Sequence, residues 1–501
     1  MKFKRSSGIL LHPSSLPGPY GIGDLGPQAY RFIDWLASTG CKLWQVLPLG
    51  PTGYGDSPYQ CFSAFAGNPY LISPDALLVD GLLTQDDLDA IKDLPAARVN
   101  FGMVIPRKLD LLQKAFSTYQ TKPEYLQQAF DYFCAENASW LDDYTLFMAL
   151  KESNGGGAWS GWPQDLRSRK KTVLRKAQKE LSASVLRHAF YQFLFFRQWD
   201  KLRLYANDRN IQIIGDIPIF VANDSADVWA HPELFYLDKA GNPTVVAGVP
   251  PDIFSAFGQL WGNPLYNWEV HKKDGYAWWL SRVRASLKIF DILRFDHFRG
   301  FAGYYEIPAD HKTAEFGRWV PGPGQELFRA IDKYLGDGLI TSSIGLPFIA
   351  EDLGLVTPDV IALLETFDLP GMKVLQFGFS GPDNPFLPHN YVPNCVAYTG
   401  THDNDTALGW FAAAEQQERE FAQRYLRVDG SDFAWDLIRA VWGSVANIAV
   451  TPMQDVLGCG GEARMNFPSR LGGNWEWRMK DEDINDHLAG KLHELNWMYL
   501  R

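Results

Sequence analysis

Residues 289–300 read IFDILRFDHFRG, in which a short apolar run over 289–295 leads into charged residues and a glycine. Near-continuous apolar runs of this length are typical of parallel strands that are covered on both faces. The same pattern recurs at 9–11, 42–47, 211–221, 347–350, 373–379, 395–398 and 446–453. Eight such strands separated by helical segments predict an α/β protein with a (β/α)8 TIM barrel.

Helical patterns lie between several of the predicted strands. Apolar residues recur at the spacing of one helix face over 28–38, 186–204 and 358–367. At the start of the last segment, Thr357 is placed to cap the helix and Pro358 occupies its first position. This alternation of strands and helices is the one that a barrel requires.

A long insertion separates the second and third predicted strands. Residues 74–210 have a largely helical pattern with a glycine break at 155–157. A structureless loop of this length is implausible in a compact domain, so we expect an inserted helical subdomain there. The catalytic barrel then comprises 1–73 and 211–501, with a loop insertion around 223–288.

The composition narrows the class of protein. A net charge of −11 argues against nucleic acid as a partner, because such binding depends on Lys and Arg neutralising phosphates. The Lys- and Arg-rich stretch at 167–179 is interpreted as a solvated helix face rather than a polyanion site. No apolar segment suits a membrane span or a signal peptide, and the 5 cysteines form no CxxC pattern, so we expect a cytoplasmic protein with reduced thiols.

Aromatic residues make up 14% of the chain and include 18 Trp. Flat rings complement the apolar faces of sugars, whose hydroxyl groups bind polar side chains. We assign about two thirds of the aromatic residues to the core of a large barrel. The remainder are available for ligand contacts, which favours a carbohydrate as one candidate ligand.

A candidate catalytic carboxylate follows the strand at 289–295. Strand alternation places Arg294 and Asp296 on one face and Phe295 on the other. The arginine is placed to keep the carboxylate ionised and oriented, as a glycosidic nucleophile requires. A structural ion pair at the strand end is an equally good interpretation of these residues taken alone.

Further polar residues follow the third, fifth and seventh predicted strands. Glu351 follows the buried run at 347–350, a position that suits a general acid. His402 and Asp403 lie in the turn GTHDNDT, and no second histidine lies at the i+4 spacing of a zinc helix, so we expect no metal site. Asp216 lies in GDIPI at the third strand, where we expect it to orient a loop or a neighbouring side chain.

Asp296, Glu351 and Asp403 come from strands four, five and seven, so they meet only if the barrel closes. Barrel enzymes carry their catalytic residues where the strands end. Two carboxyl groups about 5–5.5 Å apart support a retaining double displacement at a glycosidic bond, and a third can favour the positively charged transition state. These residue types predict an enzyme that acts on glycosidic bonds.

The motifs around these residues resemble those of one family from about residue 7 to the C-terminus. They are HPSSLPGPYGIGDLG (12–26), PTGYGDSPYQ (51–60), AFAGNPYLI (64–72), GDIPIFVA (215–222), GVPPDIFSAFGQLWGNP (248–264), RFDHFRG (294–300), AEDLG (350–354), GTHDNDT (400–406) and GNWEWR (473–478). The family is that of the amylomaltases, or disproportionating enzymes, which are 4-α-glucanotransferases of the α-amylase clan.

The resemblance implies a role for each carboxylate. Asp296 resembles the nucleophile that forms a β-glycosyl-enzyme, Glu351 the acid/base, and Asp403 the transition-state stabiliser. The implied substrate-binding residues are Arg294, His297, His402, Asp216, Tyr54, Asp56, Ser57, Tyr59, Asp252, Phe254, Gln259 and Trp261. The loops around Tyr54 and Phe254 are expected to cover the cleft and keep water from the glycosyl-enzyme.

The resemblance also implies the reaction. It predicts transfer of α-1,4-glucan segments from maltooligosaccharides to glucose or another glucan, with cyclic glucans as further products, in starch and glycogen metabolism. An α-glucan hydrolase with the same carboxylates is the nearest alternative, and a non-catalytic glucan-binding protein is an alternative of another class. We expect no cofactor, no structural calcium, no membrane association and no C-terminal β-sandwich, and the chain fits either a monomer or a homodimer.

Overall fold

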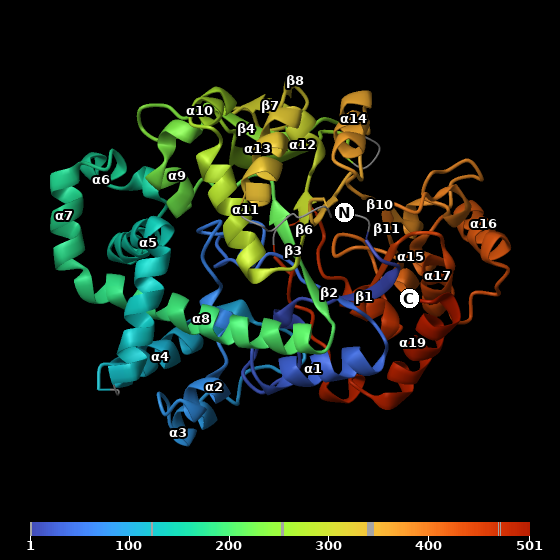
Figure 1. Cartoon of the computed structure of the whole chain (residues 1–501), viewed down its shortest axis with the longest axis horizontal. Coiled ribbons are helices and arrows are strands. Elements are labelled where there is room, and N and C mark those ends of the chain that lie inside the picture. The colour runs from blue at the N-terminus through green and yellow to red at the C-terminus, as the bar shows by residue number, and fades with distance from the viewer. Residues whose placement is uncertain (1–2, 122–123, 252–254, 338–344, 469, 471) are drawn as a thin grey trace.

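The computed structural model describes residues 3–121, 124–251, 255–337, 345–468, 470 and 472–501. An eight-stranded parallel sheet runs in the order β10-β11-β12-β1-β2-β3-β6-β9 and curls round the centre of the molecule (Figure 1). Its strands are β1 (Ser6–Leu10), β2 (Leu43–Gln45), β3 (Gln212–Pro218), β6 (Ile292–Asp296), β9 (Phe348–Ala350), β10 (Gly371–Val374), β11 (Cys395–Tyr398) and β12 (Ile448–Pro452).

The two end strands of this sheet approach each other. The amide of Ala350 in β9 donates to the carbonyl of Pro370, one residue before β10, at 3.0 Å. The amide of Met372 in β10 donates to Oδ1 of Asp352 at 2.7 Å. These bonds bring the sheet close to full closure, and the predicted (β/α)8 barrel is confirmed.

Register within the sheet sets which side chains meet at the mouth of the barrel. β3 pairs with β6 so that Asp216 lies opposite Arg294 and Pro218 opposite Asp296. β6 pairs with β9 so that Phe295 lies opposite Ala350, the last residue of β9. Glu351 follows directly after β9. The carboxyl ends of three successive strands therefore stand level with one another.

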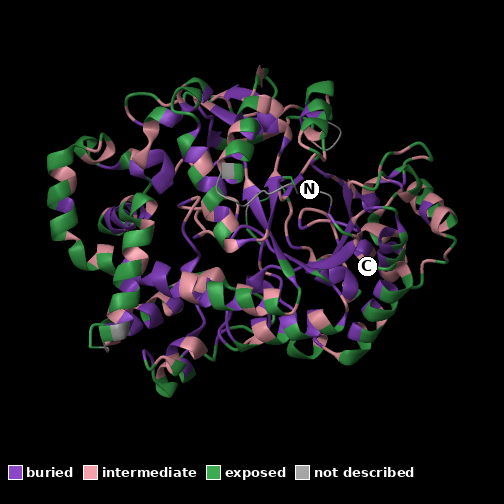
Figure 2. Cartoon of the chain, in the orientation of Figure 1, coloured by how far each residue is buried: buried purple, intermediate pink, exposed green. Residues whose placement is uncertain are grey.

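The barrel strands are largely apolar on both faces, as covered parallel strands require, and Asp216 of β3 and Arg294 of β6 are buried exceptions. In Figure 2 the buried residues concentrate on the central strands and the exposed ones on the outer helices. In β6, the ring of Phe295 packs on Phe348 with centroids 4.9 Å apart and on Phe301 at 5.5 Å. Phe295 thus points away from Arg294 and Asp296, which share the other face as predicted.

Two of the barrel helices show how the sequence specifies them. α1 (Pro27–Ser38) begins with proline at its first position and buries Phe32, Ile33 and Leu36 on one face. α14 (Pro358–Thr366) begins in the same way and buries Val360 and Leu363. The remaining helices of this part are α11 (Ala277–Ile289), α12 (Arg299–Ala302), α13 (Gly324–Asp337), α15 (Ala407–Ala413), α16 (Gln416–Leu426), α17 (Phe433–Gly443), α18 (Met453–Val456) and α19 (Asp486–Tyr499).

The segment between β2 and β3 is helical. Its helices are α2 (Pro74–Val79), α3 (Gln85–Asp89), α4 (Phe101–Tyr119), α5 (Glu124–Ser153), α6 (Gln164–Arg167), α7 (Lys171–Glu180) and α8 (Ser182–Asp208). α5, α6 and α7 lie at the left edge of Figure 1, away from the barrel, whereas α8 runs back beneath it. Trp199 of α8 donates its indole N–H to the carbonyl of Ile289 at 2.9 Å, so α8 also serves as a covering helix of the barrel.

A second sheet, which the sequence pattern does not predict, stands above the barrel. It is antiparallel, with the order β5-β4-β7-β8, and lies near the top of Figure 1. Its strands are β4 (Val245–Val249), β5 (Gln259–Pro264), β7 (Gly303–Pro308) and β8 (Arg318–Pro321). Two excursions of the chain, one after β3 and one after β6, therefore pair with each other. Two short helices, α9 (Ala226–Ala230) and α10 (Trp268–Lys273), flank the first excursion.

Some predicted boundaries differ from the structure. The strand predicted at 373–379 is instead β10, which ends at Val374 and continues as a 3-10 turn over Leu375–Phe377. Among the described residues after Pro452 no strand occurs, in agreement with the expected lack of a β-sandwich. In the part of the chain that the structure describes, no helix has the length and apolar character needed to cross a membrane.

Candidate active site

The nucleophile candidate Asp296 is the last residue of β6. Nη1 of Arg294 lies 3.0 Å from Oδ1 of Asp296 and 2.6 Å from Oδ2 of Asp216. The hydroxyl of Tyr59 donates to the same Oδ2 of Asp216 at 2.8 Å. Three strand-borne residues and one loop tyrosine thus form a chain of bonds that fixes the direction of the Asp296 carboxylate.

The charges around Arg294 act on one another. Burial lowers the pKa of Arg294, but the adjoining carboxylates of Asp216 and Asp296 outweigh it and hold that pKa well above its ordinary value. Burial raises the pKa of Asp296, the arginine opposes this, and the neighbouring carboxylates add to the rise, so the net direction is upward. The ionised form of Asp296 therefore depends on Arg294.

Glu351 follows β9 directly and is held by two main-chain donors. The amide of His297 donates to Oε2 at 2.8 Å, and the amide of Leu353 donates to Oε1 at 2.7 Å. His297 has a φ of +54°, a left-handed conformation that is uncommon for a residue with a side chain. The turn that follows Asp296 is therefore bent so that its own backbone orients Glu351, and the two candidate catalytic groups share one structural unit.

Asp403 lies in the loop after β11 and is held from another part of the chain. Nδ2 of Asn466 donates to Oδ1 of Asp403 at 2.6 Å, across 63 residues of sequence. Nε2 of His402 lies 3.4 Å from Oδ2. The main-chain carbonyl of Asp403 accepts a bond from Nη2 of Arg464 at 2.6 Å. The side chain of Asp403 is 46% exposed, which leaves its carboxylate accessible to solvent.

Three rings form an aromatic cluster beside these carboxylates. Tyr59 stacks on His402 with centroids 5.1 Å apart, and Trp475 lies 5.8 Å from Tyr59 and 5.9 Å from His402. Burial lowers the pKa of His402, which favours the neutral imidazole. A neutral, fixed imidazole is suited to hydrogen bonding with a neutral sugar hydroxyl.

The second sheet brings two predicted binding residues to the site. Trp261 of β5 lies edge-on to His297, with centroids 4.7 Å apart and planes at 87°. The indole N–H of Trp261 donates to Oε1 of Gln259 at 3.1 Å. Burial lowers the pKa of His297 to about 3, with a smaller contribution from Arg299, so this imidazole is also neutral near pH 7. Two further predicted residues, Asp252 and Phe254, lie outside the described residues.

The loop after β2 contains residues with different environments. Tyr59 belongs to the buried cluster, and its amide donates to Oγ of Ser57 at 3.2 Å. Asp56 has a φ of +56°, and burial together with Glu476 raises the pKa of its carboxyl. Tyr54 is 72% exposed, so the structure places it outside the cluster, on the surface of the same loop.

Sequence reasoning did not identify Asn466, Arg464 or Trp475 as site residues. Trp475 lies within the motif GNWEWR, and its φ of +65° marks a strained backbone at the site. Asn466 and Arg464 lie in a loop without periodicity or charge clustering. Only the folded chain brings them to Asp403, so the sequence offered no indication of their position.

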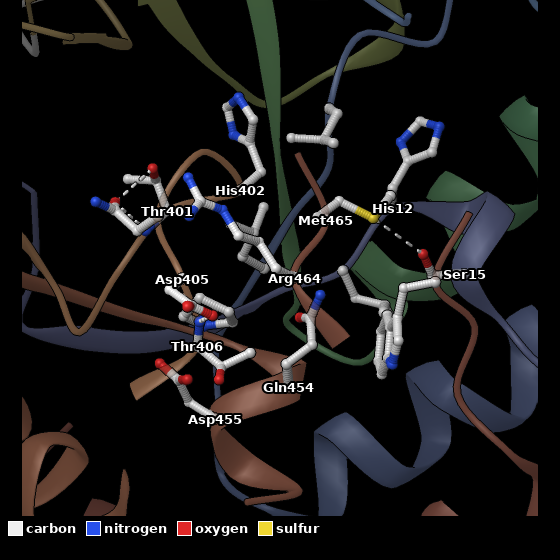
Figure 3. A pocket seen from close by; sticks show the side chains of 16 residues that line it. His12, Ser15, Thr401, His402, Asp405, Thr406, Gln454, Asp455, Arg464 and Met465 are labelled. Atoms are coloured by element: carbon white, nitrogen blue, oxygen red, sulfur yellow. Dashed lines mark hydrogen bonds between the residues drawn. The ribbon is translucent and has the colours of Figure 1, made fainter. Parts of the chain in front are cut away.

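A pocket lies beneath the loop that carries His402 and Asp403 (Figure 3). The view shows Arg464 in the middle of this pocket, between Thr401 and Met465, with Asp405 and Gln454 below it. Among the residues that the structure describes, no three His, Cys, Asp or Glu side chains are grouped to hold a metal ion. The carboxylates are instead partnered by arginine, asparagine and main-chain amides, an arrangement suited to acid–base and nucleophilic chemistry.

Known proteins agree with this architecture over the whole chain. The family model for 4-alpha-glucanotransferase matches residues 11–484. The chain is 49% identical over 503 residues to the 4-alpha-glucanotransferase of Synechocystis sp., covering 99% of this chain and 98% of that protein. It is 50% identical over 506 residues to the 4-alpha-glucanotransferase of Thermus thermophilus, covering 99% of each.

Solved structures give the same result. An amylomaltase from Streptococcus agalactiae in complex with acarbose is 40% identical, with a TM-score of 0.95 and coverage of 99% of this chain and 100% of that one. An amylomaltase from Corynebacterium glutamicum has the same fold at 17% identity, with a TM-score of 0.79 and coverage of 98% and 75%. Because the family model spans nearly the whole chain and the relatives align from end to end, this chain belongs to the 4-alpha-glucanotransferase family.

Proposed function

We propose that this protein transfers α-1,4-glucan segments from a maltooligosaccharide donor to glucose or another glucan by a retaining double displacement. The observation that carries this proposal is the arrangement of Asp296, Glu351 and Asp403 around one aromatic-lined site, with Arg294 bonded to the nucleophile candidate at 3.0 Å. Membership of the 4-alpha-glucanotransferase family supports transfer as the reaction.

In the first step, the carboxylate of Asp296 attacks the anomeric carbon of the glucosyl unit at the cleavage point. The bond from that carbon to the glycosidic oxygen breaks, and the carboxyl of Glu351 gives its proton to this leaving oxygen. The products are a β-glycosyl ester on Asp296 and a free glucan with a new 4-hydroxyl. The two amides that bond to Glu351 fix the direction in which its proton is delivered.

In the second step, an acceptor glucan or glucose replaces the first leaving group. Glu351, now a carboxylate, removes the proton of the acceptor 4-hydroxyl while that oxygen attacks the anomeric carbon, and the ester bond to Asp296 breaks. Positive charge develops on the sugar in both steps, and we assign its stabilisation to Asp403. An attack by the far end of the same donor chain yields a cyclic glucan.

The choice between transfer and hydrolysis depends on whether water reaches the ester. Trp261 stands edge-on to His297, the residue after Asp296. Tyr59 stacks on His402, and Trp475 packs at a tilt against both rings. Such rings bind an incoming sugar and reduce the room for water, which favours a glucan acceptor. A hydrolase with the same carboxylates is the alternative that this feature disfavours.

We propose that the barrel and the helical segment have separate roles. The barrel, residues 1–73 and 211–501, supplies the carboxylates, and the helical segment 74–210 supports the barrel through the contact of α8 at Ile289. We also infer a reducing compartment such as the cytoplasm, because the five cysteines are all unpaired.

Incubation with maltotriose tests the proposed reaction. We expect free glucose and longer maltooligosaccharides, while the total concentration of reducing ends stays constant. A rise in reducing ends that matches substrate loss shows hydrolysis and contradicts the proposal. Asp296→Asn is the control variant: it should retain glucan binding, measured by calorimetry, and lose transfer by at least about a thousandfold, because no glycosyl ester can form.

A further inference from the structure

The loop that carries Asp403 is fixed to the barrel at both ends. Asp455, in α18, accepts a bond from the hydroxyl of Thr399 at 2.6 Å and another from the amide of Ala407 at 2.7 Å. Nε2 of Gln376 donates to the carbonyl of Asp405 at 2.9 Å. These bonds hold the two ends of the loop, and Asp403 lies between them.

Arg464 holds the middle of this loop. Its Nη2 donates to the carbonyl of Asp403 at 2.6 Å, and its Nε donates to the carbonyl of Asn466 at 2.8 Å. Its guanidinium lies 4.5 Å from the centroid of the Phe467 ring, which limits its movement. In Figure 3 the side chain of Arg464 extends beneath His402 toward Thr401, so it reaches the loop from the side of the pocket.

We propose that Arg464 is a positioning residue for Asp403 in glucan transfer. One rigid guanidinium binds the main chain of Asp403 and the main chain of Asn466, and the side chains of these two residues are bonded to each other at 2.6 Å. The amide of Asn466 also donates to the carbonyl of His402 at 3.1 Å, and together with this main-chain bond Arg464 sets the distance between donor and acceptor of the Asn466–Asp403 bond. A lysine cannot do the same, because its single ammonium lacks the planar fork that spans two carbonyls.

The effect of losing Arg464 follows from the other restraints. The ends of the loop remain bonded to Asp455 and Gln376, and the carbonyl of His402 remains bonded to the amide of Asn466, so the chain keeps its fold while the peptide after Asp403 gains freedom to rotate. The carboxylate of Asp403 then moves relative to the sugar ring. Because positive charge on that ring develops only in the transition state, the loss appears in kcat and leaves substrate binding largely intact.

Arg464→Gln is the variant that tests this proposal, and Arg470→Gln is its matched control. Arg470 lies 5.2 Å from the same Phe467 ring, but it is exposed, and among the described residues its side chain makes no hydrogen bond to the loop that carries Asp403. We expect Arg464→Gln to lower kcat on maltotriose by about tenfold to a hundredfold with KM within about twofold. Arg470→Gln should leave both unchanged, and Arg464→Lys should recover part of the lost kcat.

A double-mutant cycle separates positioning from a general structural effect. The inference rests on the proposed role of Asp403, so Asp403→Asn must itself lower kcat strongly. In that background Arg464→Gln should cause little further loss, because there is no carboxylate left to position. Equal losses in both backgrounds, or an unchanged kcat in Arg464→Gln, overturn the inference. A fully active Asp403→Asn overturns the proposed function of Asp403 instead, so the two failures are distinguishable.

Discussion

Asp296 and Asp403 are held in contrasting ways. Asp296 is aimed by the barrel itself: its partner Arg294 lies two residues earlier in β6, and the side chains of Arg294 and Asp216 are 4% and 0% exposed. Asp403 lies on a loop, is 46% exposed, and is held by Asn466 and Arg464, which follow the last barrel strand. The proposed nucleophile is thus fixed by buried charges, and the proposed stabiliser by a neutral side-chain bond and a main-chain bond from a later segment.

This contrast predicts that substitutions beside Asp296 and beside Asp403 change activity in different ways. A substitution of Arg294 should lower activity more than a substitution of Asn466. Arg294→Gln removes the charge that opposes the upward pKa shift of Asp296. A higher pKa keeps the carboxyl protonated up to a higher pH, and a protonated carboxyl cannot attack. We therefore expect kcat/KM at pH 7 to fall by about a hundredfold or more, and the acid limb of its pH profile to move to higher pH.

The pH profile of Arg294→Gln, measured beside its far-UV circular dichroism, checks this prediction. Removal of one partner from a buried ion pair also destabilises the fold, by about 3–5 kcal/mol, so Arg294→Lys serves as the companion variant. The lysine keeps the charge, and its acid limb should stay close to that of the unaltered protein. An acid limb that does not move in Arg294→Gln would mean that the arginine only orients Asp296.

The same contrast explains how much of the site the sequence could predict. Arg294 and Asp296 belong to one strand, so alternation alone placed them on one face, and the register with β3 brought Asp216 beside them. Asn466 lies 63 positions after Asp403 in the sequence, and no local pattern encodes their contact. Residues at strand ends can be placed from the sequence because side chains alternate regularly along a strand, whereas contacts between loops depend on the complete tertiary structure.

The second sheet was missed for a related reason. β4 and β5 lie in one excursion, β7 and β8 in another, and their pairing joins Val245 to Pro308 across the barrel strand β6. Strands of four to six residues with glycine and proline look like loops when they are read singly. A place for Trp261 at the site was therefore implied by resemblance, but the sheet that brings it next to His297 was not.

Asn466→Ala should have a smaller effect than Arg294→Gln. It removes the 2.6 Å bond to Oδ1 of Asp403 and adds or removes no charge. We expect kcat on maltotriose to fall by about tenfold, since a misplaced stabiliser loses part of its interaction with the transition state. The acid limb of the pH profile should stay where it is, in contrast to Arg294→Gln. A shifted acid limb would show that Asp296 and Asp403 titrate as one electrostatic unit, and would contradict separate support of the two carboxylates.

The smallest effect is expected at Tyr54, which shares a loop with Tyr59 but not its environment. Tyr59 bonds to Asp216 and stacks on His402, whereas Tyr54 is 72% exposed. Tyr54→Ala should leave stability within about 0.5 kcal/mol and kcat on maltotriose unchanged, because a short donor reaches only the inner cluster. For long glucans we expect KM to rise by about twofold to tenfold, the range of one aromatic contact. Tyr59→Ala is the comparison, and it should lower kcat for donors of every length. A lower kcat of Tyr54→Ala on maltotriose would mean that the exposed ring of Tyr54 contacts the substrate during turnover. Exposed residues of the loop, and not only the buried Tyr59, would then contribute to catalysis.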